Sequence, residues 1–237
     1  MLLLVSGEGV SDIGGHEHGQ QGLIFTAGPM THVIDRLVEH RFDYSLLQAD
    51  SVEFVHKSEL VAAKAKNTGR MLRAPGKRRE QETRYYYENA QRLALKAVEL
   101  GARYGGPVIP VLFRDADTLS SSSRNEWQAK WQSMLDGFES GGSVLGIPML
   151  PKPKSEAWLL CACRQPPYQH CAGLEDESGN DDAPEPLKRM LSDACDGQSS
   201  AAALVGFIVE GAIDPLRIQM PSFDAFRERL SQVLDQI

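Results

Sequence analysis

The stretch Leu2–Asp12 reads LLLVSGEGVSD, a short apolar run that ends in two glycines with Glu8 between them. A continuous apolar run bounded by turn residues is typical of a strand that is buried on both faces. In open α/β sheets, ligands bind outside the carboxyl ends of the strands, which is where Glu8 and Asp12 fall. We therefore expect the first strand to carry two carboxylates into a site at the edge of the sheet.

A second stretch repeats this pattern. Pro107–Asp117 reads PVIPVLFRDAD, another apolar run that ends in two carboxylates, Asp115 and Asp117. If the two strands are neighbours, these aspartates meet Glu8 and Asp12 at one edge of the sheet. Like charges share a small space only when cations neutralise them or when some are protonated. Because carboxylate oxygens suit Mg²⁺ and Mn²⁺, the pattern predicts a divalent metal site.

Such a site would suit phosphoryl transfer. Two ions about 3.5–4 Å apart can stabilise both the attacking and the leaving oxygen of the reaction. The alternative is that Asp115 and Asp117 only form a turn or cap the next helix. The matching position of Glu8 at the end of the first strand favours the metal site.

The composition indicates a globular protein with a substantial core. The chain has 237 residues, of which 42% are hydrophobic and 24% are charged, and this fits one large domain or a core with an appended subdomain. No apolar run approaches the roughly 20 residues of a membrane span, and the first residues lack the features of a signal peptide. We therefore expect a cytoplasmic protein without a membrane partner, whose four cysteines are reduced.

The charge is unevenly distributed along the chain. The net charge of −7 argues against a general nucleic-acid coat. However, a basic run without any acid comprises Lys64, Lys66, Arg70, Arg73, Lys77, Arg78 and Arg79. This run would suit a phosphate backbone, with the tyrosines at 85–87 available to stack on bases. The alternative is a solvated helix or loop followed by tyrosines of the core.

The remaining sequence predicts alternating strands and helices. We expect strands at 1–6, 44–47, 52–55, 107–113 and 143–149. We expect helices at 28–40, 80–104, 124–138, 184–195, 199–212 and 222–236, with a further helix starting at 155. The glycine-rich residues 7–27 indicate a mobile loop over the sheet edge, and 164–183 indicate another loop. This order favours an α/β fold with a parallel core over residues 1–154 and a mainly helical region over 155–237.

Two motifs resemble the TOPRIM domain of topoisomerases, bacterial primases and nucleases of the overcoming-lysogenization-defect family. That domain has a glutamate after its first strand, matched by Glu8, and a D-x-D after a later strand, matched by Asp115 and Asp117. The E-G-x-S-D form is closest to the nuclease branch, in which the aspartate matched by Asp12 also contributes to metal binding. The resemblance implies a TOPRIM-like, mostly parallel sheet flanked by helices, with Mg²⁺ or Mn²⁺ held by these four carboxylates.

A third segment, 152–160, reads KPKSEAWLL and is similar to an E-x-W-L-L stretch of a stand-alone, uncharacterised TOPRIM-like family. Members of that family are often encoded beside an ATPase in bacterial defence clusters. The lysine of the nuclease members would be supplied by Lys152 or Lys154, which could stabilise charge on a phosphate. Glu156 is either a further ligand or general base, or an acid that compensates the dipole of the helix it begins. The resemblance covers about residues 1–165.

The expected function is therefore metal-dependent hydrolysis of phosphodiester bonds in nucleic acid, with DNA as the expected substrate. Glu8, Asp115, Asp117, Glu156 and Lys154 are the candidate catalytic residues. The resemblance alone implies an ATPase partner and a role in antiviral defence. Two alternatives stay open: a non-catalytic TOPRIM-like subunit of an ATPase complex, and a metal-dependent small-molecule phosphohydrolase. A homo-oligomer is also compatible with the sequence.

Two further groups could bind metal. His16 and His18 lie close together in the glycine-rich segment, although solvent exposure is the usual state of such residues. Cys161 and Cys163, with His170 and Cys171, could form a zinc site, but the spacing does not match a pair of zinc knuckles. We expect these cysteines, like Cys195, to be free thiols.

Overall fold

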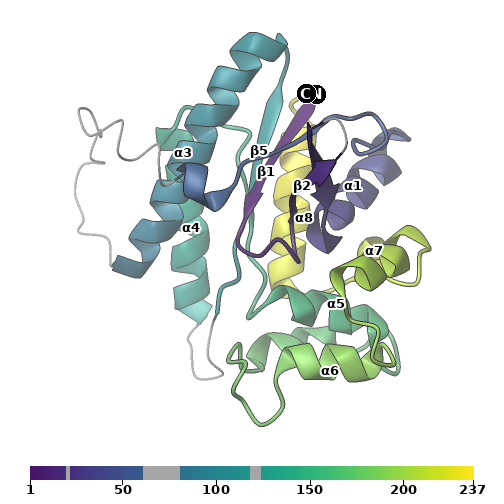
Figure 1. Ribbon diagram of the computed structural model, residues 1–237. Helices are drawn as coiled ribbons and strands as arrows, with labels where there is room; N and C mark the ends of the chain where they lie inside the picture. Colours follow the sequence, from purple (N-terminus) through teal and green to yellow (C-terminus); the bar gives the residue numbers. More distant parts are fainter. Residues whose placement is uncertain (20–21, 61–80, 118–123) are drawn as a thin grey trace.

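The computed structural model describes residues 1–19, 22–60, 81–117 and 124–237, and its centre is a four-stranded parallel sheet (Figure 1). The strands lie in the order β4-β1-β5-β6, and each neighbouring pair is parallel. Their bounds are β1 Leu2–Gly7, β4 Val52–Phe54, β5 Val108–Phe113 and β6 Ile147–Met149. The predicted α/β class with a parallel sheet is confirmed.

The two stretches that end in carboxylates form the central strands. All residues of β1 and β5 are buried, as their continuous apolar runs predict. The strands pair over their full length, from Leu2 opposite Val108 to Gly7 opposite Phe113. The residues that follow each strand therefore leave the sheet side by side at the same edge, as expected.

Helices cover both faces of this sheet (Figure 1). One face packs against α3 (Gln81–Tyr104) and α4 (Arg124–Ser140), and the other packs against α1 (Pro29–Phe42) and α8 (Pro221–Leu234). Successive residues of a strand point to opposite faces, so Leu4 lies in one apolar cluster and its neighbours in the other. The continuous apolar character of β1 follows from this two-sided burial.

Two glycines allow α3 and α4 to pack closely. A β-carbon at Gly137 would overlap the carbonyl oxygen of Tyr87 and lie 2.9 Å from Cβ of Ala90. A β-carbon at Gly141 would likewise overlap the carbonyl oxygen of Gln91. The contact between these helices therefore has no room for even a methyl group.

Gly137→Ala is expected to destabilise the fold by about 1–3 kcal/mol, because the overlap with backbone atoms forces the two helices apart. This loss outweighs the gain of up to about 1 kcal/mol in helix propensity. The free energy of unfolding from urea denaturation is the measurement. Gly173→Ala is the control, since a β-carbon there meets no atom within 4 Å. Equal stabilities of both variants and the wild type would contradict this account of the packing.

The C-terminal part is helical, as predicted. It contains α5 (Ser155–Cys163), η1 (Cys171–Asp176), α6 (Leu187–Ala194), α7 (Ala201–Val209), η2 (Pro215–Arg217) and α8. Trp158 of α5 packs edge-on against Phe223 of α8, with ring centroids 4.9 Å apart, and its indole N–H donates to Ser222 Oγ at 2.8 Å. These residues belong to the same apolar cluster as one face of the sheet. The domain boundary at residue 154 stays a prediction.

Three local predictions are wrong. Much of the glycine-rich segment forms an antiparallel pair, β2 (Gly14–Gly19) and β3 (Gly22–Ala27), because pairing satisfies its backbone and Phe25 stacks on Phe54. Residues 44–47 do not form a strand, since Asp35 accepts hydrogen bonds from the backbone N–H groups of residues 46 and 47 and holds a turn. The strand expected at 143–149 begins only at residue 147, because the Ser143 N–H closes the end of α4.

The prediction of four reduced cysteines is wrong for Cys161 and Cys171, which form a disulfide between α5 and η1. Neither thiol is then available for the zinc site considered above. Cys163 and Cys195 are free. Burial raises the pKa of the Cys163 thiol, and the neighbouring Cys195 adds to this effect.

Within the described ranges, none of the helices combines the length and the apolar character needed to span a membrane.

Candidate functional site

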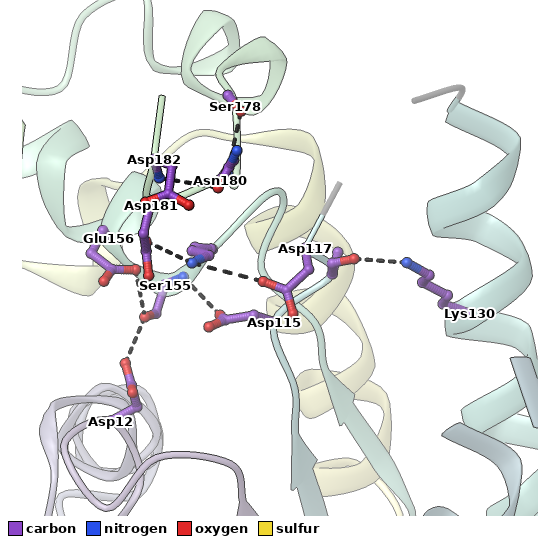
Figure 2. A network of polar contacts seen from close by, with 12 residues as sticks. Asp12, Asp115, Asp117, Lys130, Ser155, Glu156, Ser178, Asn180, Asp181 and Asp182 are labelled. Atoms are coloured by element: carbon purple, nitrogen blue, oxygen red, sulfur yellow. Dashed lines mark hydrogen bonds and ion pairs between the residues drawn. The ribbon is translucent and has the colours of Figure 1, made fainter. Parts of the chain in front are cut away.

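Ser155 lies between the carboxylates that follow the two central strands (Figure 2). Its hydroxyl donates to Asp12 Oδ1 at 2.6 Å, and its backbone N–H donates to Asp115 Oδ1 at 2.9 Å. The hydroxyl also lies 3.3 Å from Glu156 Oε2. The start of α5 therefore joins acids that are far apart in the sequence, and we call Asp12, Asp115, Asp117 and Glu156 the acid cluster.

Backbone hydrogen bonds position the later part of this cluster. Beyond β5, the N–H of Ala116 donates to the carbonyl of Pro151 at 3.1 Å, and the N–H of Asp117 donates to that of Pro153 at 3.0 Å. The residues after β5 thus run beside the segment that leads from β6 into α5. This pairing brings Asp115 against the first turn of α5. The backbone N–H groups of that turn have no partner within the helix and can donate to a carboxylate.

The acid cluster has an excess of negative charge. Burial raises the pKa of Asp115 well above its ordinary range, and the charges of Asp12 and Glu156 raise it further. Burial and the charge of Asp12 also raise the pKa of Glu156. The pKa of Asp117 is raised by burial, although the charge of Lys154 opposes the shift. Such a group of carboxylates favours a bound proton or a bound cation.

Glu8 lies beside this cluster, and its charge adds to the raised pKa of Asp117. Lys57 Nζ lies 2.5 Å from Glu8 Oε1, the Tyr85 hydroxyl donates to the same oxygen, and Arg114 Nε lies 3.5 Å from it. Burial alone would raise the pKa of Glu8, but these hydrogen bonds and charges outweigh it and lower the pKa. Glu8 therefore lies at the expected edge of the sheet but is held by basic partners.

Of the two candidate lysines, Lys154 is the one that contacts the acid cluster. Its ammonium group lies 3.9 Å from Asp117 and 2.8 Å from Asp181, whereas Lys152 lies 3.8 Å from Asp176. Burial would lower the pKa of Lys154, but the hydrogen bond and charge of Asp181 outweigh it and raise the pKa. Asp181 is therefore the closer of the two ion-pair partners of this lysine.

The remaining residues that the sequence suggested for metal or nucleic-acid binding are not part of the acid cluster. His16 packs edge-on against Phe54, with ring centroids 5.4 Å apart. Tyr86 and Tyr87 are buried, as the core alternative predicts, and the Tyr86 hydroxyl donates to the carbonyl of Asp115 at 3.0 Å. The entire basic run, residues 64–79, lies outside the described residues.

Four residues that complete this region were not predicted from the sequence: Lys57, Arg114, Ser155 and Asp181. Arg114 and Ser155 lie inside the motifs discussed above. Their positions directly before Asp115 and Glu156 were the signal that could have identified them. Lys57 is one lysine in a polar segment, and nothing in its surroundings distinguishes it. Asp181 lies in an acidic stretch that indicates only a loop.

The donor set fits Mg²⁺ or Mn²⁺ in type and in charge, since it offers only oxygen ligands around a buried carboxylate with a raised pKa. Within the ranges that the structure describes, no three histidine, cysteine, aspartate or glutamate side chains are arranged so that they could hold a metal ion. Binding would therefore require side chains of the acid cluster to turn toward a common point. The chain matches no protein-family model, no curated protein and no solved structure.

Proposed function

We propose that this protein hydrolyses phosphodiester bonds of nucleic acid, using Mg²⁺ or Mn²⁺ held by the acid cluster. The observation that carries the proposal is the position of Asp115, which is buried against Asp12 and Glu156 with its pKa raised. A buried charge among like charges is costly unless a proton or a cation compensates it. A divalent cation is the compensation that also serves phosphoryl transfer.

The bound ion would supply positive charge for the phosphate and lower the pKa of a coordinated water. Ser155 orients Asp12 and Asp115 through its hydroxyl and its backbone N–H. Glu156, whose pKa is raised by burial, would be the group that accepts a proton from the water. Lys154 would pair with a phosphate oxygen after leaving Asp181.

The wider proposal rests on the resemblance of the motifs to TOPRIM nucleases. It comprises DNA as the substrate, an ATPase as the partner and antiviral defence in the cytoplasm as the role. The basic run at 64–79 would contact the phosphate backbone.

A non-catalytic interaction subunit is the second candidate. The observation that favours it is the pairing of Glu8 with Lys57 and Arg114, because basic partners already neutralise a carboxylate that a bound ion would need. Under this alternative, the carboxylates would be structural and would not bind an ion.

Hydrolysis of bis(4-nitrophenyl) phosphate, an activated diester, separates the two candidates, because the reagent needs no ATPase partner. We expect hydrolysis in Mg²⁺ or Mn²⁺ and none in EDTA. End-labelled DNA and RNA of one sequence, each single- and double-stranded, then identify the polymer. Absence of metal-dependent hydrolysis of every substrate would contradict the proposed function.

A further inference from the structure

Arg114 is a buried cation with unused hydrogen-bond donors. Its side chain is 1% exposed, and its Nη1 group donates to the carbonyl of Phe113 at 2.7 Å. In the described part of the chain, Nε and Nη2 have no such partner, although Nε lies 3.5 Å from Glu8 Oε1. A guanidinium keeps its proton at all ordinary pH values, so this buried charge cannot be relieved by titration. Unpaired buried donors usually indicate a missing ligand or partner.

The two unused groups lie on one edge of the planar guanidinium. Nε–H and an N–H of Nη2 point the same way, and this edge binds two oxygens of a carboxylate or a phosphate side by side. Glu8 does not use it in that manner, because one carboxylate oxygen approaches Nε at 3.5 Å and Nη2 has no hydrogen-bond acceptor among the residues that the structure describes. The edge is therefore poorly matched to the anion that now lies against it.

Two further donors converge on the same point. Lys57, which follows β4, places Nζ 2.5 Å from Glu8 Oε1, and Tyr85 of α3 donates its hydroxyl to this oxygen. Lys57 Nζ also lies 5.3 Å from the centroid of the Tyr85 ring. Donors from three separate segments thus surround one carboxylate oxygen. Two cations thus face a single carboxylate oxygen.

We propose that Lys57, Tyr85 and Arg114 form a binding site for one phosphate group, which the carboxylate of Glu8 occupies in the absence of ligand. A phosphate offers more oxygens than Glu8 now presents, so it can fill the Nε/Nη2 edge of Arg114 while accepting from Lys57 and Tyr85. The side chains of Glu8 and Lys57 are 37% and 42% exposed, so the ligand can reach the site when Glu8 turns away.

The site lies beside the acid cluster, which suggests what the phosphate belongs to. Arg114 directly precedes Asp115, and adjacent tyrosines of α3 contact both groups: Tyr85 donates to Glu8, and Tyr86 donates to the Asp115 carbonyl. This assignment rests on the proposed function, in which the ligand is a phosphate of the nucleic-acid backbone next to the bond that is cleaved. Glu8, once displaced, would be free to join the acid cluster.

The test is the binding of inorganic phosphate to the metal-free protein in EDTA, measured by isothermal titration calorimetry. Glu8→Ala removes the internal carboxylate and is expected to bind phosphate about tenfold more tightly than the wild type, or better. Adding Lys57→Gln to the Glu8→Ala variant is expected to abolish this gain in phosphate affinity. Lys57 is half-exposed, so the double variant should fold, which its melting temperature verifies.

Matched controls exclude a general effect of charge. Glu99 also faces two cations, with Lys96 at 4.0 Å and Arg103 at 3.4 Å, but on the exposed surface of α3. Glu99→Ala makes the same change of charge as Glu8→Ala and is expected to leave phosphate affinity unchanged. Lys96→Gln, added to Glu8→Ala, is expected to preserve the gain.

The proposal is overturned if Glu8→Ala binds phosphate no more tightly than the wild type, or if Lys57→Gln leaves the gain intact. A dinucleotide with one phosphodiester identifies the source of the phosphate, and we expect a gain for it too. A gain for inorganic phosphate alone would contradict the assignment to a nucleic-acid backbone. Because no metal and no hydrolysis are involved, these results do not depend on whether the protein is a nuclease.

Discussion

Asp115→Asn is expected to lower metal-dependent phosphodiester hydrolysis by about a thousandfold or more while the chain stays folded. The amide keeps an oxygen that can accept the hydrogen bond from the Ser155 N–H, so the link to α5 is preserved. It removes the negative charge at the centre of the acid cluster. A thousandfold loss corresponds to about 4 kcal/mol of transition-state stabilisation, which is a reasonable cost for weakening the binding of a catalytic ion.

The rate with bis(4-nitrophenyl) phosphate in Mn²⁺ measures this effect. Asp193→Asn is the matched control, since Asp193 is an exposed aspartate of α6 that pairs with Arg189. It should retain the wild-type rate. A wild-type rate for Asp115→Asn would show that the acid cluster does not take part in the reaction.

The same substitution is expected to stabilise the metal-free protein at neutral pH. Because the pKa of Asp115 is raised in the folded state, the folded protein binds this proton more tightly than the unfolded chain does. The resulting stability is present at low pH and is lost as the pH rises from about 4 through the raised pKa. At pH 7 in EDTA, the amide needs neither a buried charge nor the uptake of a proton on folding, so it should add about 1–3 kcal/mol, or roughly 2–12 °C in melting temperature.

Mn²⁺ should reverse the order of the two proteins. At a concentration of about 1,000 times its dissociation constant, the ion would stabilise the wild type by about 4.1 kcal/mol and the Asp115→Asn variant much less, which exceeds the advantage of the variant in EDTA. The melting temperatures of the wild type and of the variant are measured from pH 4 to pH 8, once with EDTA and once with Mn²⁺. Equal stabilisation of both proteins by Mn²⁺, or a lower melting temperature of the variant in EDTA, would contradict an unpaired charge at Asp115.

The sequence was sufficient to predict the strands that position the site. Continuous apolar runs in β1 and β5 indicate burial on both faces, and parallel neighbours necessarily place Glu8 and Asp115 at one edge. The hairpin of β2 and β3 was not predictable from the same reasoning. Its many glycines suggest a loop, whereas pairing between the strands determines the observed structure.

The polar contacts of the site could not be predicted, because they join residues that are distant in the sequence. Lys57 lies 49 residues from Glu8, and Ser155 lies 143 residues from Asp12. Such contacts leave no periodic pattern. The motif places Glu8 at the end of its strand, but the choice between the acid cluster and Lys57 depends on how the side chain turns. The disulfide between Cys161 and Cys171 likewise depends on spatial distance, which spacing alone does not give.

The central claim is that the acid cluster binds a hard divalent cation, and a crystal soaked in Mn²⁺ tests it most directly. We predict an anomalous peak within about 2.3 Å of carboxylate oxygens from Asp115 and from at least one of Asp12 and Glu156. A saturating soak that leaves these oxygens without an ion, with Ser155 still bridging Asp12 and Asp115 as it does now, would contradict the claim.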